Sequence, residues 1–67
     1  MEISIKDDFI KLDSLLKFAN IAQSGGEAKM MILEGLVKVN GEVCLMRGKK
    51  IRRGDTVNVS RETLVIK

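Results

Sequence analysis

Apolar and polar residues alternate along the chain with two different periods, and these periods divide its 67 residues into helices and strands. The first helical pattern has the spacing i, i+3, i+4 and i+7, which places its apolar residues on one face of a helix. These residues are Leu12, Leu15, Leu16 and Ala19. We predict a helix over about residues 12–19, and Asn20, which tolerates positive φ, is expected to end it.

A second helix is predicted to begin after Ser24, because Ser24 and Glu27 have the S-x-x-E spacing of a capping box. In that arrangement the serine hydroxyl accepts from an N–H of the first turn, and the glutamate accepts from the N–H of the cap residue itself. One face of the helix carries the apolar residues Ala28, Met31 and Ile32. Gly35 is expected to end the helix in the left-handed conformation, which costs glycine no Cβ clash.

Met30 and Leu33 project away from that apolar face, and two interpretations of them are open. They form a second core face covered by the terminal strands, or they form an exposed apolar patch of the kind that marks a partner site. We favour coverage, because so small a domain needs nearly all of its apolar area to fold.

The remaining segments alternate with the period of two that is typical of half-buried strands. Strands are predicted at residues 2–5, 37–39, 42–45, 56–59 and 63–66, with the first and last pairing. Asn40-Gly41 is the strongest short hairpin signal, because both residues tolerate positive φ. Two helices this short are unstable alone and must pack on each other and on a sheet. We therefore predict an α+β fold with two short packed helices against a small, mostly antiparallel sheet.

The segment from Ser24 to Gly41 carries an ordered set of signals: a serine, an Ala-Lys pair, a short apolar run, and then Gly-x-Val-x-Val-Asn-Gly. This order resembles the S4-type RNA-binding domain, whose usual core is Ser-Arg-x-x-Ala-Arg followed by the same glycine-to-glycine pattern. The resemblance covers about residues 10–59. Within the family, the chain is most similar to the stand-alone bacterial members. It implies a single S4-like domain over residues 1–67 with an alpha-L motif. It also implies that the partner is RNA, and that this RNA is ribosomal RNA, free or in ribosomal particles.

Charge is unevenly distributed along the chain, whose formal net charge is +3. Residues 1–34 hold four basic and six acidic residues, whereas residues 35–67 hold eight basic and three acidic residues. Such an asymmetry indicates an anionic partner on the C-terminal half, and the alternative is a basic face that is only solvated.

Eight basic residues are candidates for phosphate contacts, since arginine forks bind phosphate oxygens in pairs and lysines act as mobile point charges. The candidates are Lys11, Lys17, Lys29, Arg47, Lys49, Lys50, Arg52 and Arg53. The resemblance implies the first three, because it places the RNA-binding surface on the helix pair and the adjoining loop, and charge and proximity add the other five. Gly25 and Met30 stand where the family commonly has basic residues, so the segment 47–53 carries more weight.

The composition favours binding over catalysis. The chain has no histidine, its single cysteine, Cys44, has no activating neighbour, and its acidic residues lack a metal-ligand pattern. We therefore predict no catalytic, cofactor or metal site. Phe9 and Phe18 are expected in the core, which leaves no aromatic platform for bases and favours shape and phosphate recognition of structured RNA.

The expected setting is a cytoplasmic monomer without membrane contact, because no signal segment opens the chain and no apolar run approaches ~20 residues. The alternative function is a small protein–protein interaction module that uses Met30, Leu33 and the edge strands. A ribosome-associated factor that touches both RNA and a ribosomal protein would combine the two functions.

Overall fold

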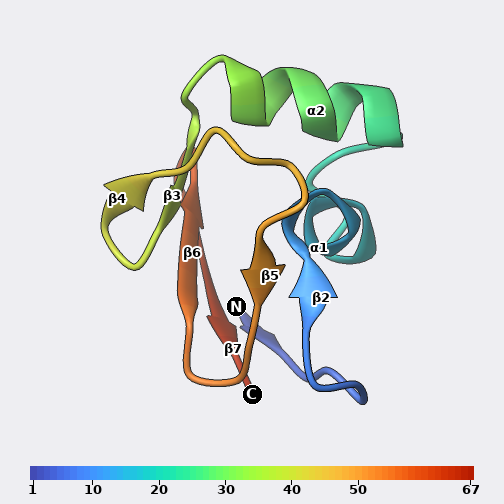
Figure 1. Cartoon of the computed structure of the whole chain (residues 1–67), viewed down its shortest axis with the longest axis vertical. Helices are drawn as coiled ribbons and strands as arrows, with labels where there is room; N and C mark the ends of the chain where they lie inside the picture. The colour runs from blue at the N-terminus through green and yellow to red at the C-terminus, as the bar shows by residue number, and fades with distance from the viewer.

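The computed structural model describes all residues from 1 to 67 and contains two helices and seven short strands (Figure 1). The helices are α1 (Leu12–Phe18) and α2 (Gly25–Leu33). The strands are β1 (Glu2–Ile3), β2 (Ile10–Lys11), β3 (Val37–Val39), β4 (Glu42–Val43), β5 (Lys50–Ile51), β6 (Thr56–Val59) and β7 (Glu62–Ile66). Neither helix is long and apolar enough to cross a membrane.

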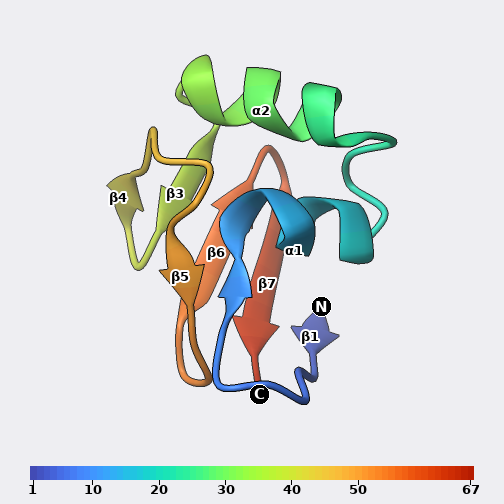
Figure 2. The same cartoon turned by 45° about the vertical axis from the view of Figure 1, so that its right-hand side comes forward.

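Five strands form one sheet in the order β1-β7-β6-β3-β4, and β2 and β5 form a separate two-stranded ribbon. Every pairing is antiparallel except that of β1 with β7. In Figure 2, α1 lies in front of β6 and β7, whereas α2 crosses the upper end of the molecule. The predicted α+β architecture is therefore confirmed, with the β2–β5 ribbon and α1 forming a layer over one face of the sheet.

The apolar face of the sheet forms half of the core, because its central strands place apolar side chains opposite each other. Val37 pairs with Val59, and Val57 pairs with both Val39 and Leu64. All five are buried. The helices and the ribbon complete the core with Leu12, Leu15, Leu16, Ala28, Ile32 and Ile51, each fully buried. The alternation seen in the sequence thus places one face of each strand against the helices.

At the start of α2, one of the two hydrogen bonds of the predicted capping box is present and the other has a different donor. The Glu27 N–H donates to Ser24 Oγ at 3.1 Å, as expected. The glutamate bond differs, because Glu27 Oε1 accepts from the N–H of Gln23 at 2.9 Å and not from that of Ser24. With Ser24 extended at φ −149° and ψ 166°, the N–H that faces the Glu27 carboxylate is that of the preceding residue.

The end of α2 is a Schellman motif centred on Gly35, whose φ is +78°. The Gly35 N–H donates to the Ile32 carbonyl and the Leu36 N–H donates to the Met31 carbonyl, both at 3.1 Å. Asn20, at φ +61°, ends α1 in the same way. Both helix terminators predicted from the sequence are confirmed.

Gly35→Val is expected to lower the free energy of unfolding by on the order of 1–2 kcal/mol, because a β-branched residue resists positive φ. A Cβ at this position would meet only Val43 Cγ1 at 3.8 Å, an ordinary contact, so the cost is conformational. Urea unfolding measures it. Gly48→Val is the control, since Gly48 has no atom within 4 Å of an added Cβ and no positive φ. Equal stabilities of the two variants would contradict this role of Gly35.

Two predictions about the core are wrong. Met30 and Leu33 are 58% and 55% exposed, because β1 and β7 pair with each other at one side of the sheet and leave the outer face of α2 uncovered. Phe18 is 63% exposed, and Phe9 is only half-buried. The strands predicted at residues 2–5 and 42–45 are also shorter, with two residues each.

Candidate nucleic-acid interface

The segment Arg47–Arg53, here called the basic segment, is fixed to the first turn of α1 by its backbone. The carbonyls of Lys49 and Arg47 accept from the N–H groups of Leu12 and Asp13 at 2.9 and 3.0 Å. No side chain caps this helix start. Because free N–H groups at a helix start need acceptors, the basic segment supplies the missing cap, and its cationic side chains are held beside α1.

The β2–β5 ribbon places two of the candidate cations directly opposite each other. Lys11 pairs with Lys50 in the ribbon, next to the pair of Ile10 and Ile51. Like charges in opposite positions of an antiparallel pair are destabilising. The ribbon therefore concentrates positive charge at a cost that an anionic ligand would relieve.

Phe9, which comes just before β2, lies beneath two cations of the basic segment. Lys50 Nζ is 4.9 Å from the centroid of its ring, and Arg52 Cζ is 6.0 Å from it. These are cation–π distances, and the ring contributes to holding both side chains over β2.

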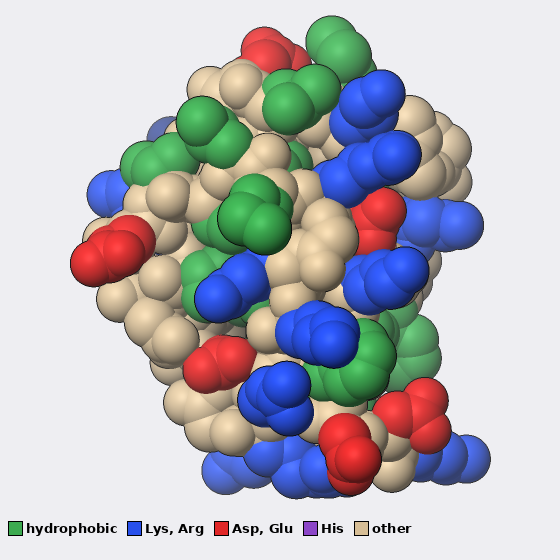
Figure 3. Space-filling view, viewed as in Figure 1, with side chains coloured by type: hydrophobic (Ala, Val, Ile, Leu, Met, Phe, Trp, Pro, Cys, Tyr) green, Lys and Arg blue, Asp and Glu red, His purple; other side chains and the backbone are tan.

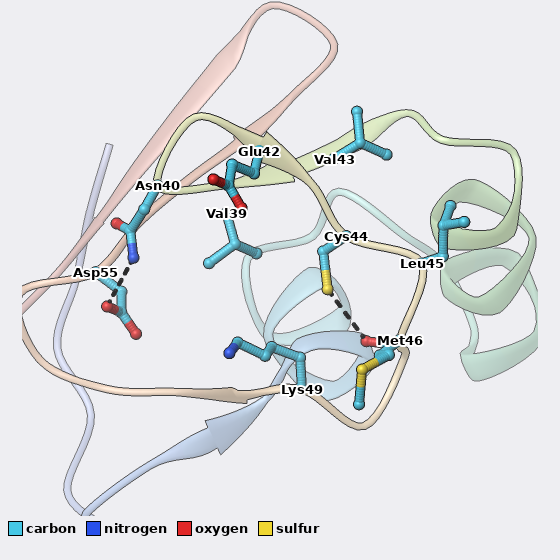
Figure 4. Close-up of a pocket in the computed structure, with 9 residues that line it drawn as sticks. All are labelled: Val39, Asn40, Glu42, Val43, Cys44, Leu45, Met46, Lys49 and Asp55. Carbon is cyan, nitrogen blue, oxygen red and sulfur yellow. Dashed lines mark hydrogen bonds between the residues drawn. The ribbon is translucent and has the colours of Figure 1, made fainter.

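Asp55 holds the turn that follows Arg52. Asp55 Oδ2 accepts from the Arg52 N–H at 2.8 Å. Asp55 Oδ1 accepts from Asn40 Nδ2 at 3.1 Å, a bond that Figure 4 shows. The bond from the Arg52 backbone lowers the pKa of Asp55 below its ordinary value of 3.8, and burial opposes this shift. The Asn40 side chain and the charges of Lys49 and Arg52 lower the pKa further. The ionised carboxylate thus ties the basic segment to the β3–β4 hairpin.

A hollow of about 470 Å³ separates that hairpin from the basic segment, and Figure 4 shows the side chains around it. Lys49 lines it together with the carboxylates of Glu42 and Asp55. Cys44 Sγ donates to the Met46 carbonyl at 3.7 Å, which is a structural contact for this thiol. Because acidic groups outnumber the cation here, the hollow by itself is not suited to an anion.

The structure brings five of the eight predicted cations together around the start of α1 and the β2–β5 ribbon. They are Lys11, Arg47, Lys49, Lys50 and Arg52. Arg53 has a structural contact as well, since its Nη2 donates to the Ile5 carbonyl at 2.9 Å. Lys17 and Lys29 are exposed on α1 and α2, and no hydrogen bond or ion pair connects them to the cluster.

None of the eight candidates forms an ion pair, because the single ion pair of the structure joins Lys67 and Glu2 at 3.3 Å. Lys and Arg side chains gather over β2 and β5 on the face shown in Figure 3. No group of three or more His, Cys, Asp and Glu side chains is placed to hold a metal ion. The arrangement is therefore an exposed, unneutralised cationic surface on a fixed backbone.

Phe18 and the contact of Phe9 with the cations were missed by the sequence analysis, which assigned both rings to the core. Helical spacing carries a signal for Phe18, since this residue falls roughly 100° away from the centre of the α1 apolar stripe. The sequence carries no comparable signal for Phe9, because its partners Lys50 and Arg52 are more than 40 residues away along the chain.

Two short helices on an antiparallel sheet, with an unneutralised cationic surface beside the first helix, define a small α+β domain of the alpha-L type. The chain belongs to the S4 domain family, whose sequence pattern it matches over residues 3–67. The resemblance found in the sequence is therefore confirmed.

Individual relatives agree with this assignment. The probable ribosome maturation protein RlbA of Bacillus subtilis (strain 168) is 44% identical over 57 residues, covering 85% of this chain and 80% of the relative. The putative RNA-binding protein YbcJ of Escherichia coli (strain K12) is 36% identical over 61 residues, covering 91% of this chain and 87% of the relative.

Solved structures show the same fold. The solution structure of YbcJ from E. coli, described as having an alpha-L motif involved in RNA-binding, matches with a TM-score of 0.74 and 35% identity. The match covers 97% of this chain and 84% of that one. The 30S ribosomal protein S4e from Thermoplasma acidophilum matches with a TM-score of 0.71 and 24% identity, over 87% of this chain and 31% of that one.

Proposed function

We propose that this protein is a non-catalytic RNA-binding protein that recognises structured RNA, and ribosomal RNA in particular, through phosphate contacts. The contact residues are Lys11, Lys17, Lys29, Arg47, Lys49, Lys50, Arg52 and Arg53. Those on the basic segment and β2 form the centre of the surface, and the two helix lysines extend it. The role is that of a ribosome-associated or assembly factor in the cytoplasm.

The observation that carries this proposal is the absence of ion-pair partners around a cluster of cations on fixed backbone. Lys11 faces Lys50 across the ribbon, and no carboxylate within 4.0 Å neutralises either of them. A surface of this kind gains most from a partner with closely spaced negative charges. RNA phosphates meet that requirement, and proteins that neutralise them release counterions.

We propose ribosomal RNA as the ligand because of the names of two relatives. One is named as a probable ribosome maturation protein, and the other as a putative RNA-binding protein. Both are matched over at least four fifths of their own length, so the comparison concerns nearly whole proteins.

Affinity for a structured ribosomal RNA fragment is expected to fall steeply with salt. If about four phosphates are neutralised, a plot of log affinity against log salt should have a slope of about −3 to −4. Fluorescence anisotropy with a labelled fragment, titrated at several KCl concentrations, measures this slope. An affinity that does not change with salt would refute phosphate contacts as the main source of binding.

A second candidate function is contact with a ribosomal protein next to the bound RNA, and the exposed apolar side chains favour it. Six large ones form what we call the apolar patch: Met30, Leu33, Leu36, Val43, Leu45 and Met46. Figure 3 shows apolar side chains gathered over α2 and the β4 side, beside the cationic area. Met46 directly precedes Arg47, so the apolar patch and the basic segment meet along the chain. A ribosomal particle presents protein and RNA side by side, and we assign the apolar patch to contact with its protein component.

Met30→Ser combined with Leu33→Ser is expected to weaken association with ribosomal particles by severalfold while leaving the affinity for naked RNA unchanged. Both side chains are exposed, so the substitutions should not disturb the core. Sedimentation with ribosomal particles and anisotropy with the isolated RNA fragment make the comparison. Unchanged particle association would exclude these two residues from a protein contact.

A further inference from the structure

A second hollow, of about 360 Å³, lies beside the cationic surface and has two aromatic rings in its wall. Its apolar lining consists of Ile5, Phe9, Ile10 and Phe18, and its polar lining consists of Ser4, Lys6 and Asp7. The volume is at the lower end of the roughly 300–1,000 Å³ that is usual for small-molecule sites. It therefore has room for a single planar ring system.

Phe18 is the unusual member of this wall. It lies in the last turn of α1, is 63% exposed, and forms no part of the buried core. An exposed phenylalanine ring in so small a protein loses the stabilisation that burial would give it. Phe9, which comes just before β2, lines the same hollow. Lys50 and Arg52 lie over the Phe9 ring.

Positive charge borders the hollow on several sides. Lys6 is in its lining, Lys50 and Arg52 are over Phe9, and Arg53 donates to the carbonyl of Ile5 at 2.9 Å. On the face shown in Figure 3, apolar side chains near β2 have Lys and Arg side chains above and to the left of them, and Asp or Glu side chains below them. Asp7 is the one acidic side chain of the lining, so the cations Lys6, Lys50 and Arg52 outnumber it around the hollow. Such a hollow is complementary to a group that is planar in the middle, negatively charged outside and able to donate a hydrogen bond.

We propose that this hollow receives one unpaired nucleobase of the bound RNA, which stacks on Phe18 while its flanking phosphates contact Lys6, Lys50 and Arg52. Asp7 and Ser4 supply acceptors for an exocyclic amino group of the base. The proposal rests on the RNA-binding function proposed above and makes it specific, since structured RNA with a bulged or flipped-out base becomes the preferred ligand. It also replaces the sequence-based expectation that no aromatic platform exists.

The test compares two hairpin RNAs with the same stem, one fully paired and one with a single bulged 2-aminopurine. The bulged hairpin is expected to bind about fivefold tighter or more, which is the scale of stacking one base on an aromatic ring. The 2-aminopurine fluorescence should also change on binding, because the base leaves its neighbours in the RNA for the hollow. Phe18→Leu, which keeps an apolar side chain without a ring, should remove both effects, and Phe18→Trp should preserve them.

Other outcomes overturn the proposal in distinguishable ways. If both hairpins bind equally, or if Phe18→Leu keeps the preference, the base site is wrong although RNA binding stands. If neither hairpin binds, the proposed function fails together with the site. If Phe18→Leu weakens only the association with ribosomal particles, the occupant is an apolar side chain of a protein and not a base.

Discussion

Replacing Lys49, Lys50 and Arg52 together with glutamine is expected to lower the affinity for structured RNA by about a hundredfold at about 0.15 M salt. Each phosphate contact releases about one counterion, so losing three contacts lowers the affinity by about a hundredfold at that salt concentration. It corresponds to about 2.7 kcal/mol of binding free energy. The salt slope should flatten by roughly one unit for each lost contact. Arg53 is left in place because its guanidinium holds the Ile5 carbonyl.

The matched control replaces Lys38, Arg61 and Lys67 with glutamine, which removes the same number of positive charges from other parts of the surface. Lys67 pairs with Glu2, and an exposed ion pair of this kind contributes little to stability. Lys38 is on the outer face of the sheet, where it pairs with Asn58, and Arg61 is in the β6–β7 turn. Both variants should keep their circular dichroism spectra, since all six side chains are exposed. We expect the RNA affinity of the control variant to fall by less than threefold. Equal losses would mean that RNA responds to net charge and not to the basic segment.

Ile32→Ala is expected to destabilise the fold by about 2–5 kcal/mol, because Ile32 is fully buried and its truncation leaves a cavity. A domain of this length has roughly 3–10 kcal/mol of total stability, so the variant should be close to unfolded at room temperature. Thermal and urea unfolding followed by circular dichroism measure the loss.

Leu33→Ala is the control in the same helix turn, and its loss should be within about 0.5 kcal/mol. Leu33 is 55% exposed, and alanine is as good a helix former as leucine. A large loss at Leu33 would restore the sequence-based expectation that this side chain is covered. A small loss of stability in Ile32→Ala would instead show that this face of α2 does not pack against the core.

Local signals in the sequence predict the helices, their ends and the central hairpin well. Gly35, Asn20 and Asn40-Gly41 all adopt the positive φ expected of them, because this preference belongs to the residue itself and needs no distant partner. Ser24 caps α2 for the same reason. The alternation of Val37 and Val39 likewise fixed which face of β3 is buried.

The errors concern side chains whose surroundings come from distant segments. Whether Met30 and Leu33 are covered depends on the path of β1 and β7, which no local pattern encodes. A small domain does not bury all of its apolar area, because exposed apolar side chains are common on protein surfaces. Phe18 is a different case, because its helical position, roughly 100° away from the centre of the α1 apolar stripe, is a local signal that already favours exposure.

For the candidate interface, the sequence identified the basic residues but not their arrangement. Charge counting found the basic segment, and the structure adds that Lys11 faces Lys50 and that Arg53 binds the Ile5 carbonyl. The register of β2 against β5 joins residues about 40 positions apart, so sequence spacing alone does not reveal it.

The two carbonyls that complete the start of α1 have a consequence for binding entropy. Because Arg47 and Lys49 are hydrogen-bonded to that helix, the backbone of the segment is ordered when the protein folds and not when a ligand arrives. Ordering a free backbone costs about 1–2 kcal/mol per residue, and a ligand that meets an ordered loop avoids that cost. Fraying of α1 would release the loop at the same time. The stability of one short helix and the affinity for an anion are thus linked through two hydrogen bonds.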